Sequence, residues 1–301
     1  MQLLVFIFLC IVWGTTWVAI KMSLEGLPPF LSASFRFAFA LVLLFLYTRI
    51  MSVSIRVKRK DFGVLALSAF LMYTFDYGLI YWGEQYLSAG ITAIFFATFP
   101  IFTAVWANFL FRNEAFHWVK FLGLLLGFAG IFIVFYDQLI ITQFDQKVII
   151  ASLAIVIGAA GGAMSVVIVK KYLPGINPIS LTFNQMLLGF FSLLVFGMIL
   201  ENVNQIHFNL RVIVAVIYLG AIGSALAFAL YYWLLKQLSA ITLSLIIYIT
   251  PIVAIIFDYL VYGELIQIRT IIGMLVTFSG IALTQFNLNQ LRKIVLMRKN
   301  I

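Results

Sequence analysis

Three charged side chains fall inside long apolar stretches of the sequence: Arg36, Asp76 and Asp258. A charge at the centre of a membrane helix costs at least ~2.5–3.5 kcal/mol, so it usually faces water, a partner or a ligand. Arg36 lies seven residues after Pro29, and Asp76 lies seven residues before Gly83. At about 1.5 Å rise per residue, both are expected ~10 Å below the same boundary. This permits an ion pair that locks two helices together, or a site in which Arg36 meets an anionic group and Asp76 exchanges a proton.

Aromatic and amide side chains accompany these charges. Tyr73, Tyr77 and Tyr81 follow the i, i+4, i+8 spacing of one helix face, a pattern that more often reflects packing or a headgroup belt than a ligand site. Tyr73 and Tyr77 are too deep for that belt, so their hydroxyls need an internal partner or water. We expect a shared polar cavity lined by Arg36, Tyr73, Asp76, Tyr77 and Gln185. Further candidates to line it are Trp13, Trp17, Phe95, Trp106, Tyr231 and Tyr248.

The composition indicates that a membrane surrounds these residues. Hydrophobic residues make up 64% of the 301 residues, charged residues only 10%, and the mean hydropathy is +1.14. Because soluble domains carry ~25% charged residues, we predict an integral membrane protein. The single cysteine, Cys10, cannot form an intrachain disulfide. His117 and His207 lack ligand spacing, so neither a metal site nor a cofactor is expected.

Apolar runs of roughly 20 residues, the length of a membrane-spanning helix, occur ten times. They are continuously apolar, which favours helices over alternating strands. The fold class predicted is therefore an all-α membrane protein with ten transmembrane helices. The predicted spans are Leu3–Ile20, Phe30–Tyr47, Phe62–Trp82, Leu87–Phe111, Val119–Tyr136, Val148–Val169, Ile179–Leu200, Val212–Leu235, Ser239–Tyr262 and Ile271–Phe286.

The two halves of the chain repeat each other. The segment Tyr77–Glu114 is followed about 150 residues later by a similar segment, Phe228–Glu264. Both contain a Tyr-Trp pair, the triplet Leu-Ser-Ala, a mid-run proline (Pro100 or Pro251) and a final glutamate. In this repeat, Gln185 is the counterpart of Arg36 at a spacing of 149. Such self-similarity indicates an internal duplication.

The basic residues predict how the duplicated halves are oriented. With the N-terminus in the cytoplasm, the inner loops and tail hold fourteen of the nineteen Lys and Arg residues, and the outer loops hold four. This bias favours two cytoplasmic termini and explains the net charge of +9 without a nucleic-acid partner. Because five spans per repeat is an odd number, the repeats must be inverted, as in secondary transporters. The predicted units are residues 1–136, a connecting loop at 137–147, residues 148–286 and a basic cytoplasmic tail at 287–301.

The chain resembles the EamA-type branch of the drug/metabolite transporter superfamily. The resemblance rests on WGTTWVAIK (Trp13 to Lys21), SFRF around Arg36, two LSA…P…E segments, and the glycine pairs Gly123/Gly130 and Gly273/Gly280. It covers residues 3–286, and departs from the family pattern at Asn113, where Gly-Glu is usual. It implies a carrier of amino acids, nucleotide metabolites or drugs, and leaves the substrate open.

From these features we expect a secondary transporter in the inner or plasma membrane that moves a small organic metabolite, as an exporter or exchanger, by alternating access. Pro100 and Pro251 would act as hinges, and Asp76 as a proton-coupling group. The expected partners are a small-molecule substrate and the bilayer; the oligomeric state stays open. Two alternatives remain: an intramembrane aspartyl protease using Asp76 and Asp258, although its signature motifs are missing, and a channel or structural membrane protein.

Overall fold

The computed structural model describes residues 1–111, 118–141, 145–253 and 267–285, and within these ranges the chain is helical, without strands. Seven helical segments of the described chain are long and apolar enough to span a membrane, and three shorter apolar helices complete the set. These helices fall at the ten predicted positions, so the prediction of an all-α fold with ten spans is confirmed. Asp258 lies outside the described residues.

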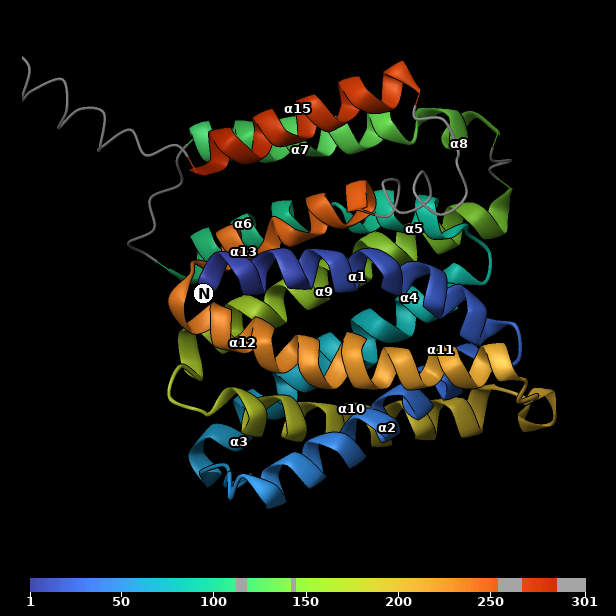
Figure 1. Cartoon of the computed structure of the whole chain (residues 1–301), viewed down its shortest axis with the longest axis vertical. Helices are drawn as coiled ribbons and strands as arrows, with labels where there is room; N and C mark the ends of the chain where they lie inside the picture. The colour runs from blue at the N-terminus through green and yellow to red at the C-terminus, as the bar shows by residue number, and fades with distance from the viewer. Residues whose placement is uncertain (112–117, 142–144, 254–266, 286–301) are drawn as a thin grey trace, which may run out of the picture.

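Some spans consist of more than one element (Figure 1). The long segments are α1 (Gln2–Leu24), α2 (Pro29–Ile50), α3–η1–α4 (Arg59–Ala69, Phe70–Asp76, Tyr77–Glu84), α5–α6 (Ala89–Phe96, Phe99–Leu110), α9 (Gln146–Tyr172), α10 (Pro178–Leu200) and α11–η3–α12 (Leu210–Gly220, Ala221–Leu226, Ala227–Gln237). The shorter ones are α7 (Trp118–Val134), Ala240–Val253, which begins with α13 (Ala240–Ser244), and α15 (Ile268–Gln285). The short helices α8 (Tyr136–Ile141) and η2 (Val203–Gln205) lie in connections.

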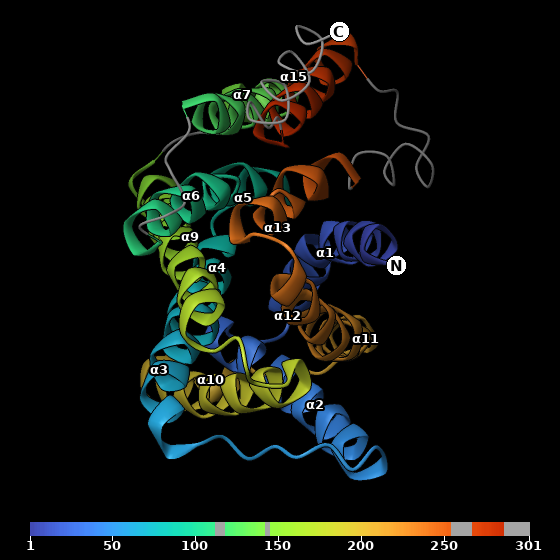
Figure 2. The ribbon, with the colours of Figure 1, turned by 90° about the vertical axis from the view of Figure 1, so that its left-hand side faces the viewer.

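The helices run side by side in one bundle. Figures 1 and 2 show α7 and α15 as a pair along one edge, with α2, α3 and α10 along the opposite edge. The α7–α15 contact uses glycines that correspond in the two repeats. A Cβ on Gly123 would lie 2.8 Å from the Gly280 carbonyl oxygen, and one on Gly130 would lie 2.7 Å from the Gly273 carbonyl oxygen. The start of α7 therefore meets the end of α15, so the two equivalent helices are antiparallel.

Helices α2 and α10, the second span of each repeat, are antiparallel as well. The Glu201 carboxylate follows the end of α10 and accepts hydrogen bonds from the backbone N–H groups of Phe30 (2.7 Å) and Leu31 (3.0 Å) at the start of α2. Two pairs of corresponding helices thus run in opposite directions, as an inverted repeat requires. The same bonds satisfy N–H groups that a helix start leaves without an intrahelical acceptor.

Replacing Glu201 with alanine is expected to lower the free energy of unfolding by about 0.5–2 kcal/mol, the usual range for losing an N-terminal cap. Thermal unfolding in detergent measures the change. The matched control is Glu25→Ala, because Glu25 makes an exposed ion pair with Arg211 (3.4 Å), worth at most ~1 kcal/mol. Equal losses in the two variants would contradict the capping role of Glu201.

Both repeats carry a π-helical turn in the third span. The turn η1 covers Phe70–Asp76 and η3 covers Ala221–Leu226, about 150 residues apart. Single π-turns inside α-helices are frequent at functional sites.

The structure also explains the repeated Leu-Ser-Ala triplets. Ser88 and Ser239 cap the starts of α5 and α13, because their side chains accept hydrogen bonds from backbone N–H groups.

The prolines lie near interruptions of the fourth span of each repeat. The helix breaks at Ala97–Thr98 and restarts as α6, with Pro100 in its first turn. In the second copy a turn at Leu245 precedes the helical stretch that contains Pro251. Proline lacks the N–H group of a continuous helix and crowds the preceding turn, which explains the break before Pro100. A hinge role for either proline remains a prediction.

Candidate functional site

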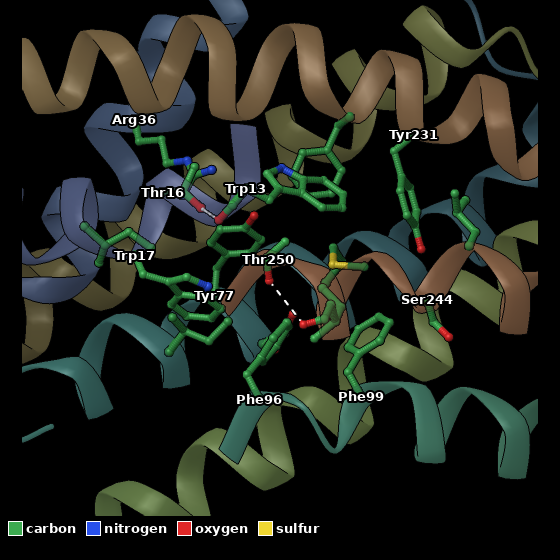
Figure 3. Close-up of a pocket in the computed structure, with 17 residues that line it drawn as sticks. Trp13, Thr16, Trp17, Arg36, Tyr77, Phe96, Phe99, Tyr231, Ser244 and Thr250 are labelled. Atoms are coloured by element: carbon green, nitrogen blue, oxygen red, sulfur yellow. Dashed lines mark hydrogen bonds between the residues drawn. The ribbon is translucent and has the colours of Figure 1, made fainter. Parts of the chain in front are cut away.

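A cavity of about 60 Å³ lies between the two repeats (Figure 3). Because one water needs at least ~10–15 Å³ of such space, the cavity holds only a few waters. Its walls come from the first, second, third and fourth spans of the first repeat and from the third and fourth spans of the second. The lining residues are Trp13, Thr16, Trp17, Ile20, Arg36, Met72, Asp76, Tyr77, Ile80, Phe96, Phe99, Phe228, Tyr231, Leu243, Ser244, Ile247 and Thr250.

Arg36 crosses from the first repeat to the π-turn of the second. Its side chain is 1% exposed; Nε donates to Ser224 Oγ at 2.5 Å and Nη2 donates to the Gly223 carbonyl at 3.1 Å. Nη1 donates to Tyr81 Oη at 3.4 Å. The guanidinium carbon lies 4.8 Å from the centre of the Tyr77 ring, close enough for a cation–π interaction. The Gly223 carbonyl also accepts from Trp13 Nε1 at 3.3 Å, so η3 positions two residues of the cavity wall.

The guanidinium retains hydrogen-bonding capacity beyond these contacts. A guanidinium has five N–H donors, one on Nε and two on each terminal nitrogen. Among the residues that the structure describes, one donor of each nitrogen has an acceptor. These three bonds leave one N–H on Nη1 and one on Nη2, and the neighbouring Tyr77 hydroxyl is a further acceptor for the guanidinium. Arg36 also lines the cavity, and a guanidinium is a suitable partner for a carboxylate or phosphate.

Asp76, the last residue of η1, packs against the glycine-rich face of α9. A Cβ on Gly158 would lie 3.2 Å from Asp76 Oδ1, and one on Gly162 would lie 2.8 Å from Asp76 Cγ. The glycines of α9 thus make room for the carboxyl group. Asp76 is 1% exposed, and Oδ1 has no hydrogen-bond donor in the described part of the chain. Enclosure of this kind penalises an ionised carboxylate.

Arg36 and Asp76 do not form the ion pair that their equal depth permits. The ion pairs found between described residues are Arg211–Glu25 and Arg269–Asp137. Arg36 points toward η3, whereas Asp76 points toward α9. No carboxylate of the described residues forms an ion pair with the guanidinium of Arg36.

The structure brings six of the predicted site residues into the cavity wall and places the others elsewhere. Arg36, Asp76, Tyr77, Trp13, Trp17 and Tyr231 line the cavity. Tyr73 is buried beside Phe37 and Phe228, with ring centres 5.2 and 5.1 Å away. Gln185 donates to Ser68 Oγ at 2.6 Å. Three other candidates also lie outside the cavity wall: Phe95, Trp106 and Tyr248. Trp106 donates a hydrogen bond to the Ala160 carbonyl, and Tyr248 donates one to the Leu124 carbonyl.

Several residues of the site were not predicted from sequence. Phe96 and Phe99 line the wall instead of Phe95. Phe95 and Phe96 are neighbours in α5, and successive side chains of a helix point about 100° apart. Ser224, the acceptor for Arg36, is the repeat counterpart of Tyr73 at a spacing of 151. That correspondence is visible in the aligned halves and is the signal that could have identified Ser224.

Comparison with known proteins identifies relatives along the whole chain. The model of the EamA-like transporter family matches residues 1–136 and again residues 149–286. The uncharacterized transporter YoaV of Bacillus subtilis is 26% identical over 280 residues, covering 93% of this chain and 95% of that protein. An uncharacterized transporter of Archaeoglobus fulgidus is 26% identical and covers 89% of this chain and 93% of its own.

Two further relatives extend the comparison. Protein PagO of Salmonella typhimurium is 24% identical, covering 93% of this chain and 91% of that protein. A solved crystal structure has a TM-score of 0.78 at 15% identity, and covers 94% of this chain and 95% of its own. At that identity the likeness concerns the fold alone.

Proposed function

The chain belongs to the EamA-like transporter family, and we propose that it is a secondary carrier for a small organic anion, such as an amino acid or a nucleotide-type metabolite. The family consists of membrane transporters rather than enzymes, and the ten helices make the chain a multi-pass membrane protein. The carrier would act as an exporter or exchanger in the cell membrane, with both termini in the cytoplasm, as the distribution of basic residues favours.

The geometry of Arg36 carries the proposal. Its side chain is enclosed, lines the cavity, and forms no ion pair with a carboxylate of the described residues. A carboxylate or phosphate that enters the cavity would balance the charge and accept hydrogen bonds from the guanidinium. The rings of Trp13, Trp17 and Tyr231 in the same wall suit an apolar or ring-bearing remainder of the substrate.

The size of the cavity supports alternating access. In this conformation the cavity has room for only a few waters, and we expect the helices around it to move apart when a substrate enters. The wall is shared by two inverted repeats, whose rocking against each other is the usual motion of such carriers. Pro100 and the break before it, together with Pro251, are the proposed hinges.

Asp76 is the proposed proton-coupling group. Asparagine resembles the neutral carboxyl group, so Asp76→Asn is expected to fold like the wild type. Because it cannot release a proton, its transport should respond less to a pH gradient than wild-type transport does. Flux in proteoliposomes with and without the gradient measures this. If wild type and Asp76→Asn both transport independently of pH, Asp76 has no role in coupling.

The proposed function is tested by screening radiolabelled amino acids and nucleotide metabolites for uptake into proteoliposomes. A carrier predicts saturable uptake of an anion-bearing compound that related carboxylates or phosphates inhibit. Non-saturable flux would favour a channel, and the absence of flux for every anionic compound would overturn the assignment of substrate class.

A further inference from the structure

Glu84, the last residue of α4, is a buried carboxylic acid that the cavity does not use. Its side chain is 0% exposed, and neither Oε1 nor Oε2 has a hydrogen-bond donor among the described residues. It lies at the end of the span Arg59–Glu84, directly before the exposed side chains of Gln85 and Tyr86. Glu84 is therefore enclosed by protein but only one residue away from the boundary of the bundle.

The nearest basic side chain does not pair with the Glu84 carboxyl group. Lys21, near the end of α1, donates from Nζ to the backbone carbonyls of Glu84 (2.5 Å) and Leu87 (2.8 Å). The first bond satisfies a carbonyl that the end of α4 leaves without an intrahelical donor, and the second satisfies a carbonyl of the connection to α5. No ion pair between Lys21 and Glu84 is present in the described ranges. Lys21 thus acts on the backbone of this turn.

The second repeat has the same lysine cap without an acid. Lys170, the counterpart of Lys21 at a spacing of 149, donates from Nζ to the carbonyls of Leu235 (2.6 Å) and Lys236 (3.4 Å) at the end of α12. The position that corresponds to Glu84 is Leu235, which is 2% exposed. The packing of this turn therefore needs only a buried apolar side chain. The carboxyl group of Glu84 is an addition that the architecture does not explain.

The charged and titratable groups around Glu84 come from four helices, α1, α2, α9 and α4 itself. Lys21 of α1 and Arg36 of α2 act on it electrostatically, and Tyr81 lies one turn earlier on α4 itself. Lys147 at the start of α9 lies over the ring of Tyr86, 6.0 Å from its centre. The two cations favour an ionised Glu84, but both donate to other acceptors. An enclosed carboxylate without a donor costs several kcal/mol, so burial decides in favour of the neutral acid.

We propose that Glu84 is a proton-binding site at the end of the bundle where α4 ends, and that it holds its proton in this conformation. When the two repeats rock and this end opens, water reaches Glu84 across Gln85 and Tyr86, and the proton leaves. Lys21 is then adjacent to balance the carboxylate. That Glu84 binds the proton is inferred from its burial and its lack of a donor among the described residues. That it releases the proton during transport rests on the proposed function.

Infrared spectroscopy of the purified full-length protein in nanodiscs at neutral pH tests the proposal, with the exchangeable proton as the probe. The wild type should show the C=O stretching band of protonated carboxylic acids, shifted in heavy water. Glu84→Gln should lose part of this band, and the exposed control Glu25→Gln should lose none. Labelling every glutamate of the wild type with a heavy carbon isotope should shift the Glu84 component and leave that of Asp76, without any substitution.

Lys21→Met separates the neutral acid from an ion pair. If Glu84 is protonated, the wild type already has the band and Lys21→Met leaves it unchanged. A glutamate band that is missing from the wild type and emerges in Lys21→Met would show an ionised Glu84 paired with Lys21, and would overturn the proposal. The measurement uses no solute, so its result is independent of whether the protein transports an organic anion.

Discussion

Replacing Arg36 with glutamine is expected to weaken binding of the transported anion by about ten- to a hundredfold, the equivalent of ~1.5–3 kcal/mol for losing charge-assisted hydrogen bonds. The substitution removes the positive charge and the guanidinium donors from the cavity wall. The fold should tolerate glutamine, because Gln185 occupies the equivalent position of the second repeat and is fully buried. The half-saturating concentration of uptake in proteoliposomes measures the effect.

Arg49→Gln is the matched control, since Arg49 lies on the same helix but outside the cavity, over the ring of Phe45. It should bind the anion like the wild type. The affinity of Arg36→Lys for the anion should lie between those of the wild type and Arg36→Gln, because lysine keeps the charge but loses the planar pair of donors. If Arg36→Gln folds and transports the anion with unchanged affinity, Arg36 has only a structural role between the repeats.

Gly280→Leu is expected to be among the most destabilising single substitutions in the bundle. A Cβ at Gly280 would lie 2.6 Å from the Gly123 carbonyl oxygen and 2.7 Å from Gly127 Cα. Backbone atoms cannot rotate away, so α7 and α15 must separate. We expect a loss of at least about 1–3 kcal/mol, the usual cost of overpacking, seen as a lower midpoint of thermal unfolding in detergent.

Gly63→Leu controls for the change of residue type. Gly63 also lies in a helix, but it is exposed and a Cβ there meets nothing within 4 Å. Leucine favours helix over glycine by up to ~1 kcal/mol, so this variant should be as stable as the wild type or more so. A Gly280→Leu protein that unfolds at the wild-type temperature would show that close approach of the two repeats at these glycines is not needed.

The positions of the spans could be predicted because a bilayer imposes a minimum apolar length on each helix. The predicted span Ile179–Leu200, for example, is observed as Pro178–Leu200. The inversion followed from the odd number of spans in each repeat, and the bonds from Glu201 to the start of α2 agree with it. The length of each apolar run and the number of runs in each repeat can be counted in the sequence, so these predictions needed no knowledge of packing.

The direction in which side chains point could not be predicted in the same way. Equal depth brought Arg36 and Asp76 to one level, but depth does not fix the rotation of a helix about its axis. Arg36 faces η3 and Asp76 faces α9. Each residue along a helix turns its side chain by about 100°, so an error of one residue separates Phe95, which was predicted, from Phe96, which lines the cavity.

The π-turns were also beyond the sequence patterns. The turns η1 and η3 pack against α10 and α2 of the opposite repeat, and no local sequence pattern indicates such contacts. Comparing the two halves nevertheless shows where the repeats differ. Arg36 corresponds to Gln185, Asp76 to Ala227 and Glu84 to Leu235, so the first repeat alone places charge-bearing groups at these buried positions.

Counterflow in proteoliposomes tests the central claim, one cavity that opens alternately to the two sides and binds an anion at Arg36. Vesicles containing wild-type protein are loaded with an unlabelled compound that the screen shows to be transported, and the same radiolabelled compound is added outside. With the wild type and Arg49→Gln, we expect the label inside the vesicles to rise transiently above its equilibrium level. With Arg36→Gln at the same concentration, we expect far less accumulation of label. Label that equilibrates without overshoot, at a rate independent of loading, would contradict it.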